Sequence, residues 1–528
     1  PTVNLGAGRS ATAISAGGGH TCALLDDGSL KCWGWNYHGT LGLGDTDHRG
    51  DQPGEMADDL PSVRLGTFRT AIATTTGYAH TCAVLDDATL KCWGFNGHGR
   101  LGQGVRESWR DGSNWGDEPG EMGDDLRAVA VGDSDSARLA VSAYQSGRGL
   151  PGTTVAVTAR IANTGGVAIS GLTIGPDCGP PPSTLAAGAE TEVTCGRTLS
   201  ESDRPSVDHV IVASSDQVPS AATTVTLVFE RAHPQRSIAV ASGTGHRCAL
   251  LDSGTLRCWG SNYRGQLGLG DTDGRGDQAG EMVDNLPAVD LGTGRSATAI
   301  TAGGDHGCAL LDHGTVKCWG DNSSGQLGLG DTDDRGDQPG EMGDNLAAVD
   351  LGAGRAATAL SAGGSHTCAL LDDQTVKCWG SNWYGQLGFG VFTSRGDGAG
   401  EMGDNLPTVD LGAGRTATAI TAGSSHTCAL LDNGAVKCWG YNDFGQLGLG
   451  DTKHRGDQPG EMGAHLPAVD LGTGHTATAI TAGGYHTCAL LDDETVRCWG
   501  GNASGQLGLG DTTHRGDGPG EMGDNLPA

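Results

Sequence analysis

The chain has 528 residues, of which 93 are glycine, and its formal net charge at pH 7 is −30. The glycine content argues against a helical solenoid, and the negative charge opposes nucleic acid as a partner. Because no run of eighteen apolar residues occurs, the sequence predicts no transmembrane segment. The N-terminus lacks a charged segment followed by an apolar one, so we expect Pro1 to begin a mature or trimmed chain whose export signal is missing.

A unit of about 60 residues is repeated seven times along the chain. Each copy contains a histidine, then a cysteine two residues later, then the tripeptide Cys-Trp-Gly. The histidines are His20, His80, His246, His306, His366, His426 and His486. Such fixed-period similarity indicates a repeat architecture, in which neighbouring units bury one another's apolar faces. The interval from His80 to His246 is longer than the others, so it must hold an insertion.

We therefore expect residues 1–131 to hold the first two repeats, residues 132–236 to form an inserted domain, and residues 237–528 to hold five repeats and the ring closure. Within one repeat, residues 357–362, 366–372 and 375–380 read as short strands separated by turns. The Val-Asp-Leu-Gly segment after Asn-Leu-Pro is a candidate fourth strand. Four short antiparallel strands per repeat predict an all-β, seven-bladed β-propeller. Alternation along the hairpin puts Cys368, Leu370, Val376 and Cys378 on one face, which we expect to pack against the next blade.

Fourteen of the sixteen cysteines form pairs with nine residues between the partners. The intervening residues are two apolar arms around a turn centred on Asp27 in the first copy, so a hairpin places the two sulfurs opposite each other. The spacing fits zinc ligands badly. Disulfides, and hence an oxidising, extracellular or cell-surface location, are the prediction. The pairs are Cys22 with Cys32, Cys82 with Cys92, Cys248 with Cys258, Cys308 with Cys318, Cys368 with Cys378, Cys428 with Cys438, and Cys488 with Cys498, and a further bridge is expected between Cys178 and Cys195.

The segment Ala-Gly-Gly-Asp-His-Gly-Cys-Ala-Leu-Leu-Asp-His-Gly-Thr-Val-Lys-Cys-Trp-Gly-Asp-Asn-Ser-Ser-Gly-Gln-Leu-Gly, at 302–328, resembles the repeat of the regulator of chromosome condensation family. The resemblance implies a seven-bladed propeller, and it covers nearly all of the chain outside the insertion. It implies fold more strongly than function, because members range from a nuclear exchange factor to a plant light sensor and a secreted bacterial inhibitor. The paired cysteines and an acidic segment ending in Pro-Gly-Glu-Met depart from the family pattern. Both favour a bacterial, secreted type over a chromatin-bound one.

The two ends of the chain would nearly join into one internal linker, which predicts that the first residues complete the last blade. In the insertion, segments with a period of two are separated by Gly, Pro and Asn turns. This pattern indicates an immunoglobulin-like sandwich, similar to the adhesion-type modules of bacterial surface proteins. We expect it to act as a rigid arm.

The repeated histidines and the seven repeated tryptophans are expected to be structural, because a ring holds equivalent residues apart. We expect the histidines to form hydrogen bonds between strands and the tryptophans to pack between blades. No catalytic constellation stands out, so the sequence predicts no enzyme and no required cofactor. Carboxylates alternate at residues 42–51, yet Arg49 and Met56 occupy slots where a calcium loop needs ligands. Calcium is kept as a minor alternative. Six copies of Arg-Gly-Asp are read as local pairing of arginine with acids, not as adhesion motifs.

The positions that differ between copies predict the binding surface. They flank the repeated asparagine after Cys-Trp-Gly or precede the repeated histidine, and many are aromatic. The second copy adds two tryptophans, in a loop six residues longer than its counterparts. Unlike aromatic residues on equivalent loops are typical of recognition surfaces. The simpler alternative is that they only cover neighbouring loops. The predicted partner-binding residues are Trp35, Tyr37, His38, Tyr78, Phe95, Trp109, Trp115, Tyr263, Arg264, Trp383, Tyr384, Tyr441, Phe444 and Tyr485.

The sequence thus predicts a non-enzymatic extracellular scaffold that binds a macromolecule, in the first place a protein, through these loops. A glycan-binding lectin is the second hypothesis, because aromatic platforms beside Asp, Asn and His suit sugar stacking. A structural subunit that assembles with further copies of itself is the third.

Overall fold

The structure is a computed structural model of the whole chain. It describes residues 3–104, 114–131, 237–282 and 285–526, together with the backbone of the strands between residues 139 and 227. The chain divides into two compact units, one made of residues 1–131 and 236–528 and the other of residues 132–235. In these described ranges, no helix has the length and apolar character that a membrane crossing requires.

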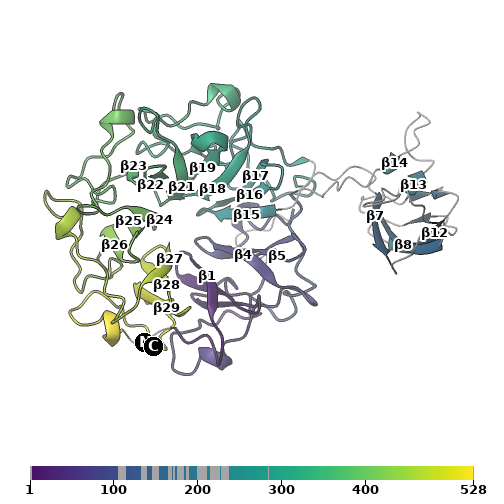
Figure 1. Cartoon of the computed structure of the whole chain (residues 1–528), viewed down its shortest axis with the longest axis horizontal. Coiled ribbons are helices and arrows are strands. Elements are labelled where there is room, and N and C mark those ends of the chain that lie inside the picture. Colours follow the sequence, from purple (N-terminus) through teal and green to yellow (C-terminus); the bar gives the residue numbers. More distant parts are fainter. Residues whose placement is uncertain are drawn as a thin grey trace. The chain divides into compact units, whose positions relative to one another are not determined.

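The first unit is a ring of seven three-stranded antiparallel sheets, or blades (Figure 1). The inner strands of successive blades contact one another around the whole ring, and the last inner strand contacts the first. The predicted all-β fold with seven blades is therefore confirmed. Blades 1 to 3 are β1 (Ala11–Ala16), β2 (His20–Leu25) and β3 (Leu30–Gly34); β4 (Ala71–Thr76), β5 (His80–Leu85) and β6 (Leu90–Gly94); and β15 (Ser237–Ser242), β16 (His246–Leu251) and β17 (Leu256–Gly260).

The other four blades repeat the same arrangement. Blades 4 and 5 are β18 (Ala297–Ala302), β19 (His306–Leu311) and β20 (Val316–Gly320); and β21 (Ala357–Ala362), β22 (His366–Leu371) and β23 (Val376–Gly380). Blades 6 and 7 are β24 (Ala417–Ala422), β25 (His426–Leu431) and β26 (Val436–Gly440); and β27 (Ala477–Ala482), β28 (His486–Leu491) and β29 (Val496–Gly500). Short 3-10 turns are described at Ala57–Asp59, Gly97–Gly99, Asp312–Gly314, Gly343–Asn345, Gly403–Asn405, Gly463–His465 and Gly523–Asn525.

Each blade is pinned by one disulfide between its middle and outer strands. In blade 4, Cys308 of β19 lies directly opposite Cys318 of β20, and their Cα atoms are 4.1 Å apart. The same bridge forms in all seven blades, so the fourteen predicted partners are confirmed. The predicted pair Cys178 and Cys195 lies outside the described side chains. A bridge that closes a loop of this size stabilises the fold by about 2 to 3 kcal/mol in the chain-entropy model.

The core consists of seven apolar clusters, each shared by two neighbouring blades. Cys368, Leu370 and Val376 of blade 5 pack against Leu431 and Trp439 of blade 6. These blade 5 residues are the face that alternation along the hairpin predicts. All seven repeated tryptophans are fully buried, and the Trp439 indole N–H donates to the Gln386 carbonyl of the preceding blade at 2.9 Å. Both expectations, the packing face and the structural role of the tryptophans, are confirmed.

The predicted fourth strand is not present in the described blades. The Val-Asp-Leu-Gly segment makes a single backbone hydrogen bond to the outer strand, from Val349 N–H to the Val316 carbonyl at 2.9 Å. At the other end of the same outer strand, Gly320 pairs with Arg335. The segment then turns away at Gly352, whose φ of 106° is a glycine conformation. The edge of each sheet is thus covered at two points without a continuous strand.

The ring is closed by the first described residue. Val3 pairs with Val496 of β29, and its N–H donates to the Val496 carbonyl at 2.7 Å. Val3 and Leu5 are buried in a cluster with Cys488, Val496 and Cys498 of blade 7. The expected completion of the last blade by the start of the chain is confirmed, by one pairing and not by a full strand.

The second unit contains antiparallel strands. Its largest sheet has the order β12-β8-β7, and shorter strands form one further three-stranded and one two-stranded sheet. An immunoglobulin-like arrangement of these strands is not shown and stays a prediction. The strands are β7 (Leu139–Gln145), β8 (Thr154–Asn163), β9 (Ile169–Ser170), β10 (Thr173–Ile174), β11 (Thr184–Leu185), β12 (Glu190–Thr198), β13 (Ile211–Ser214) and β14 (Thr226–Leu227).

Candidate functional site

Within the described residues, the positions that differ between copies lie on one face of the ring. Ala16 pairs with Thr21 and His20 pairs with Gly34, so the turn between inner and middle strands leaves the sheet at the same end as the loop after the outer strand. We call this side the upper face, formed in blade 1 by residues 17–19 and 35–44 and in the other blades by their equivalents. The hairpin turns near Asp27 and the segments that precede the inner strands lie on the opposite, lower face.

A buried asparagine fixes each upper loop. The Asn36 side-chain oxygen accepts from Leu41 N–H at 2.9 Å, and its amide donates to the Asp45 carbonyl at 2.9 Å. Asn382 in blade 5 makes the same pair of bonds with Leu387 and Val391. Satisfied buried polar groups of this kind hold a loop in one conformation. The neighbouring positions project from that scaffold, which explains why the asparagine repeats while its neighbours differ.

A first aromatic cluster joins blades 1 and 2. It consists of Trp35, Tyr37, His38 and Phe95. The Trp35 and Tyr37 rings stack at 6.4 Å, and the His38 ring lies 4.6 Å from Phe95. Arg100 covers the Phe95 ring at 4.8 Å. Tyr37 is 68% exposed, whereas the other three are half-buried, so the cluster offers one accessible ring on a supported base.

A second aromatic cluster spans blades 5, 6 and 7. It consists of Tyr384, Tyr441, Phe444 and Tyr485, with His454 and His514 at its edge. The Tyr384 and Tyr441 rings lie 4.7 Å apart, and Phe444 and Tyr485 lie 5.3 Å apart. Edge-to-face contacts between aromatic rings contribute stability in addition to that from the burial of their apolar area. Tyr384 and Tyr485 are exposed.

Burial favours the neutral form of one ring in each cluster. Burial lowers the pKa of His38 below its ordinary value. Burial, with a hydrogen bond to Asp443, raises the pKa of Tyr441 to about 12. These two neutral rings lie on a strongly acidic protein, and desolvating them on binding costs less free energy than desolvating charged groups.

Three further predicted residues lie on the same face outside the clusters. Trp383 is 73% exposed. The Tyr263 hydroxyl donates to Asp305, and burial together with this bond raises its pKa. Arg264 pairs with Asp334 at 3.2 Å. Tyr263 and Arg264 are thus held by acids of the next blade, whereas Trp383 has a free face.

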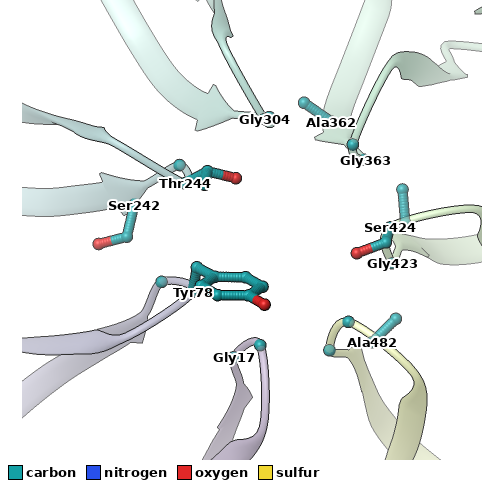
Figure 2. A pocket seen from close by; sticks show the side chains of 18 of the residues that line it. Gly17, Tyr78, Ser242, Thr244, Gly304, Ala362, Gly363, Gly423, Ser424 and Ala482 are labelled. Carbon is teal, nitrogen blue, oxygen red and sulfur yellow. The ribbon is translucent and has the colours of Figure 1, made fainter. Parts of the chain in front are cut away.

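Tyr78 lies apart from the clusters, at the central opening of the ring. The opening has a volume of about 150 Å³ and is lined by the turns between inner and middle strands of all seven blades. Figure 2 shows the Tyr78 ring beside this opening among glycine, alanine, serine and threonine residues. The lining offers no acid, base or nucleophilic thiol.

The structure accounts differently for the two extra tryptophans of blade 2. Trp115 pairs with Gly94, which is the place that Arg49 takes beside Gly34 in blade 1. Its half-buried ring packs against the apolar clusters on both sides of the blade. This packing gives Trp115 a structural role, and its part in partner binding stays a prediction. Trp109 lies outside the described residues.

The acidic segment is used by the protein itself. Asp45 accepts from Asp47 N–H at 3.0 Å and pairs with Arg49 at 2.6 Å. The Glu55 carboxylate accepts from Gly50 N–H and Gln52 N–H, both at 3.0 Å. The equivalent arginines of blades 3, 4, 6 and 7 pair with their own aspartates in the same way. The Arg-Gly-Asp arginines therefore pair locally, as expected, and these carboxylates already have donors in the places where calcium would need them.

One group in the described residues could hold a metal ion, and it lies on the lower face. His475, Asp492 and Asp493 place one ligand atom each within 4.8 Å of the others. In blade 1 the same place holds Arg9 with Asp26 and Asp27. The trio is thus the blade 7 version of a repeated ion pair.

Sequence reasoning missed several residues of the upper face. His454, His514 and Arg100 contact the clusters, and Asp305 binds Tyr263. Their loops are adjacent only across blade boundaries. The signal was present for the histidines, because His454 and His514 occupy equivalent places in two copies of the acidic segment.

The comparisons with known proteins agree with this fold. The family model described as RCC1-like domain matches residues 185–525, and the model of the regulator of chromosome condensation (RCC1) repeat matches residues 11–40 and 71–100. The chain is 28% identical to the ultraviolet-B receptor UVR8 of Arabidopsis thaliana over 293 residues, which are 55% of this chain and 58% of the receptor. It is 29% identical to the E3 ubiquitin-protein ligase HERC2 of Homo sapiens over 279 residues, 52% of this chain and 5% of the ligase.

Among solved structures, human WBSCR16 matches with a TM-score of 0.51 and 15% identity, covering 93% of this chain and 87% of that one. At this identity the match shows the fold alone. The chain spans little more than half the length of the plant receptor and a small part of the ligase.

Proposed function

Because this chain belongs to the family of the RCC1-like domain, we propose that it is a non-enzymatic binding protein that recognises another protein through the two aromatic clusters of its upper face. The proposal includes an exported, bacterial type and an extracellular or cell-surface location. The fold alone does not carry it, because one fold hosts many functions.

The observation that carries the proposal is the contrast between repeated and drifting positions on one face. Blades 5, 6 and 7 share a scaffold, and their loops bring three tyrosines and one phenylalanine into one surface. Blade 4 has Ser323 and Ser324 at the corresponding loop positions. Packing between blades does not require this difference. Rigid aromatic rings on well-supported loops bury large areas at low entropic cost, as interface hot spots do.

Charge supports a protein partner over a nucleic acid. The net charge of −30 repels phosphate backbones. Arg264 and the arginines of the acidic segment are already paired with acids. A partner with basic residues around an apolar patch would complement this face and would be steered towards it.

The disulfides support the location. Each of the fourteen bridged cysteines is at most 1% exposed, so the bridges form as the blades fold and need an oxidising compartment. The second unit is assigned as an immunoglobulin-like arm that takes no part in partner binding. Deleting residues 132–235 should therefore leave the affinity unchanged.

The test compares two variants of the full chain in affinity capture from the surface and secreted proteins of the source organism. The triple variant Tyr37→Ser, Tyr384→Ser and Tyr485→Ser removes the exposed rings of the two clusters. Phe68→Ser, the control, removes a ring that is 95% exposed on the lower face. We expect a protein that wild type and control retain and that the triple variant loses. Equal recovery by all three would contradict the proposal.

Binding constants for the purified partner then locate the hot spots. Truncating a hot-spot ring typically costs about 2 kcal/mol, so a single variant should raise Kd by about 30-fold. Melting temperatures equal to the wild type would exclude unfolding as the cause.

A glycan ligand is the second candidate, and Trp383 favours it. Its ring is 73% exposed and has a free face for stacking against a sugar. Glycan-array binding that disappears in Trp383→Ala, and persists in Tyr37→Ser, would select the lectin function over protein recognition.

A further inference from the structure

We call the contact between two neighbouring blades a seam. Five of the seven seams contain the same buried pair of hydrogen bonds, from a histidine to a threonine hydroxyl and from that hydroxyl to a backbone carbonyl. We call this pair of bonds the relay. At the seam between blades 5 and 6, His366 Nε2 lies 3.0 Å from the Thr427 hydroxyl. That hydroxyl donates to the Gln386 carbonyl at 2.9 Å, which leaves its oxygen to accept from the histidine. The other four histidines with this partner are His20, His306, His426 and His486.

The seam between blades 2 and 3 lacks the relay because Arg247 stands where the others have threonine. Arg247 pairs across its hairpin with Trp259, whose indole donates to the Arg100 carbonyl at 3.2 Å. This is the carbonyl that the threonine hydroxyl would reach in other blades. The Arg247 side chain therefore begins at the seam, facing His80 and the Arg100 loop of blade 2.

Arg247 is completely buried and has no partner. Its relative exposure is 0%, and its Nε, Nη1 and Nη2 atoms make no hydrogen bond within the described residues. Both ring nitrogens of His80 are likewise buried and unpartnered. His246, whose next neighbour at the following seam is Gly307 in place of threonine, is in the same state. The Nε atom of Arg100, a residue that is only 9% exposed, adds a further unpartnered donor.

No acidic group among the described residues acts on Arg247. The charged group that acts on Arg247 is Arg100, whose effect is repulsive. Asp305 acts on Arg100 and is engaged by Tyr263 and Gln266. A guanidinium does not lose its proton in proteins, and a buried charge without a counter-ion is strongly unfavourable. The seam thus offers donors without acceptors.

We propose that the buried seam around Arg247, between blades 2 and 3, binds a small monovalent anion of the halide class, with chloride as the natural ligand. The anion accepts from the Arg247 guanidinium and from a ring N–H of His80. Because Arg247 has no exposure to solvent, a protein carboxylate from outside does not reach it. A larger oxyanion would need a wider cavity and a greater loss of hydration. The site is separate from the aromatic surface, and its failure would leave the proposed function untouched.

Thermal unfolding of the full chain in chloride and in gluconate at equal ionic strength tests the site. Gluconate is too large to enter a buried seam. We expect wild type to melt several degrees higher in chloride, because a ligand that binds only the folded state stabilises it. Arg247→Thr restores the residue of the regular seams, and we expect it to melt at the same temperature in both salts. General salt effects act on both proteins alike, so the difference between them isolates the site.

Arg264→Ser is the matched control, because it removes an exposed arginine of the upper face and leaves the seam intact. It should keep the full dependence on chloride. The proposal is overturned if wild type melts equally in both salts, or if Arg247→Thr keeps the same dependence on chloride.

Anomalous scattering from crystals grown in bromide gives a second readout that does not depend on stability. We expect a peak within hydrogen-bond distance of Arg247. Bromide found only at surface arginines would mean an adventitious ion only and would overturn the proposal.

Discussion

The seam between blades 5 and 6 and the seam between blades 2 and 3 solve the same packing problem with different polar groups. The first buries His366 with Thr427, and the second buries His80 and Arg247 without partners. Both keep the apolar cluster and the bond from tryptophan to a carbonyl of the preceding blade. The difference teaches that apolar packing and the indole bond define a seam, whereas the histidine relay is an added contribution that two seams do without.

Lowering the pH should reduce the stability of the fold more than any of the substitutions below, because it acts on several buried histidines at once. Burial lowers the pKa of His20 and His366 to about 3 and that of His306 and His486 to about 4, against 6.5 in the unfolded chain. Below pH 6.5 the unfolded state therefore binds more protons than the folded state, and stability falls as pH falls towards 4. Each such histidine costs about 1.4 kcal/mol per pH unit in that window.

We expect the protein to unfold cooperatively between about pH 6 and pH 4. Circular dichroism measured across this pH range checks the expectation. Glu55 and the equivalent glutamates of other blades oppose this loss of stability. Burial raises their pKa in the folded state, so their protonation stabilises the fold as the pH falls. A chain that stays folded at pH 4 would show that the histidine rings are hydrated and not buried neutral.

Removing one disulfide should have the next largest effect. The double variant Cys428→Ala and Cys438→Ala, in blade 6, opens a cross-link with a sequence separation of 10. The expected loss is about 2 to 3 kcal/mol, measured by denaturant unfolding. The same change at Cys308 and Cys318 in blade 4, beside the seam that lacks the relay, should cost an equal amount. A clearly larger loss in blade 4 would show that the relay supports its neighbouring blades.

Thr427→Val should remove the two hydrogen bonds of one relay while keeping the volume of the side chain. The substitution leaves His366 Nε2 buried without its partner, which costs about 1 to 3 kcal/mol. The Gln386 carbonyl stays satisfied by the Trp439 indole. Thr427→Ser keeps the hydroxyl and serves as the control, with a smaller loss expected. If valine and serine prove equally stable in urea titrations, the relay contributes nothing.

Gly307→Thr should introduce the missing threonine at the seam between blades 3 and 4, and its effect on stability should be the smallest of the series. A Cβ atom at Gly307 would lie 3.2 Å from the Trp319 ring, a contact that the other blades accommodate beside their own threonines. The new hydroxyl would give His246 the partner that it lacks, which should add about 1 kcal/mol of stability. Gly307→Val fills the same space without the hydroxyl. Equal melting temperatures for the two variants would assign the gain to packing.

Much of the fold could be predicted because seven copies report the same constraint. Cys308 and Cys318 face each other because the hairpin between them has two equal arms, and Val376 faces the next blade by alternation. The prediction of a fourth strand was wrong. One hydrogen bond at Val349 and one pairing at Arg335 stand in place of a continuous series of backbone hydrogen bonds. A sequence pattern does not distinguish a true strand from a segment that covers a sheet edge at isolated points.

The site was less predictable for a different reason. Tyr441 and Phe444 are visible as departures from the repeat, yet the surface they form with Tyr384 and Tyr485 depends on which loops meet across a seam. Trp115 looked like a loop residue because its loop differs in length from the other copies. Its pairing with Gly94 shows instead that it replaces an arginine. Arg247 and Gly307 are plain in the sequence, but their effect depends on the histidine of the preceding blade.

The pairing of Val3 with Val496 also has a consequence for biosynthesis. Val3 leaves the ribosome long before Val496, because almost all of the ring lies between them in the sequence. At about 5 to 20 residues per second, the valine waits on the order of half a minute or more for its partner. During that interval the first blade and the most recently finished blade each leave one apolar flank uncovered, and exposed apolar flanks of this kind favour aggregation until the last sheet closes the ring.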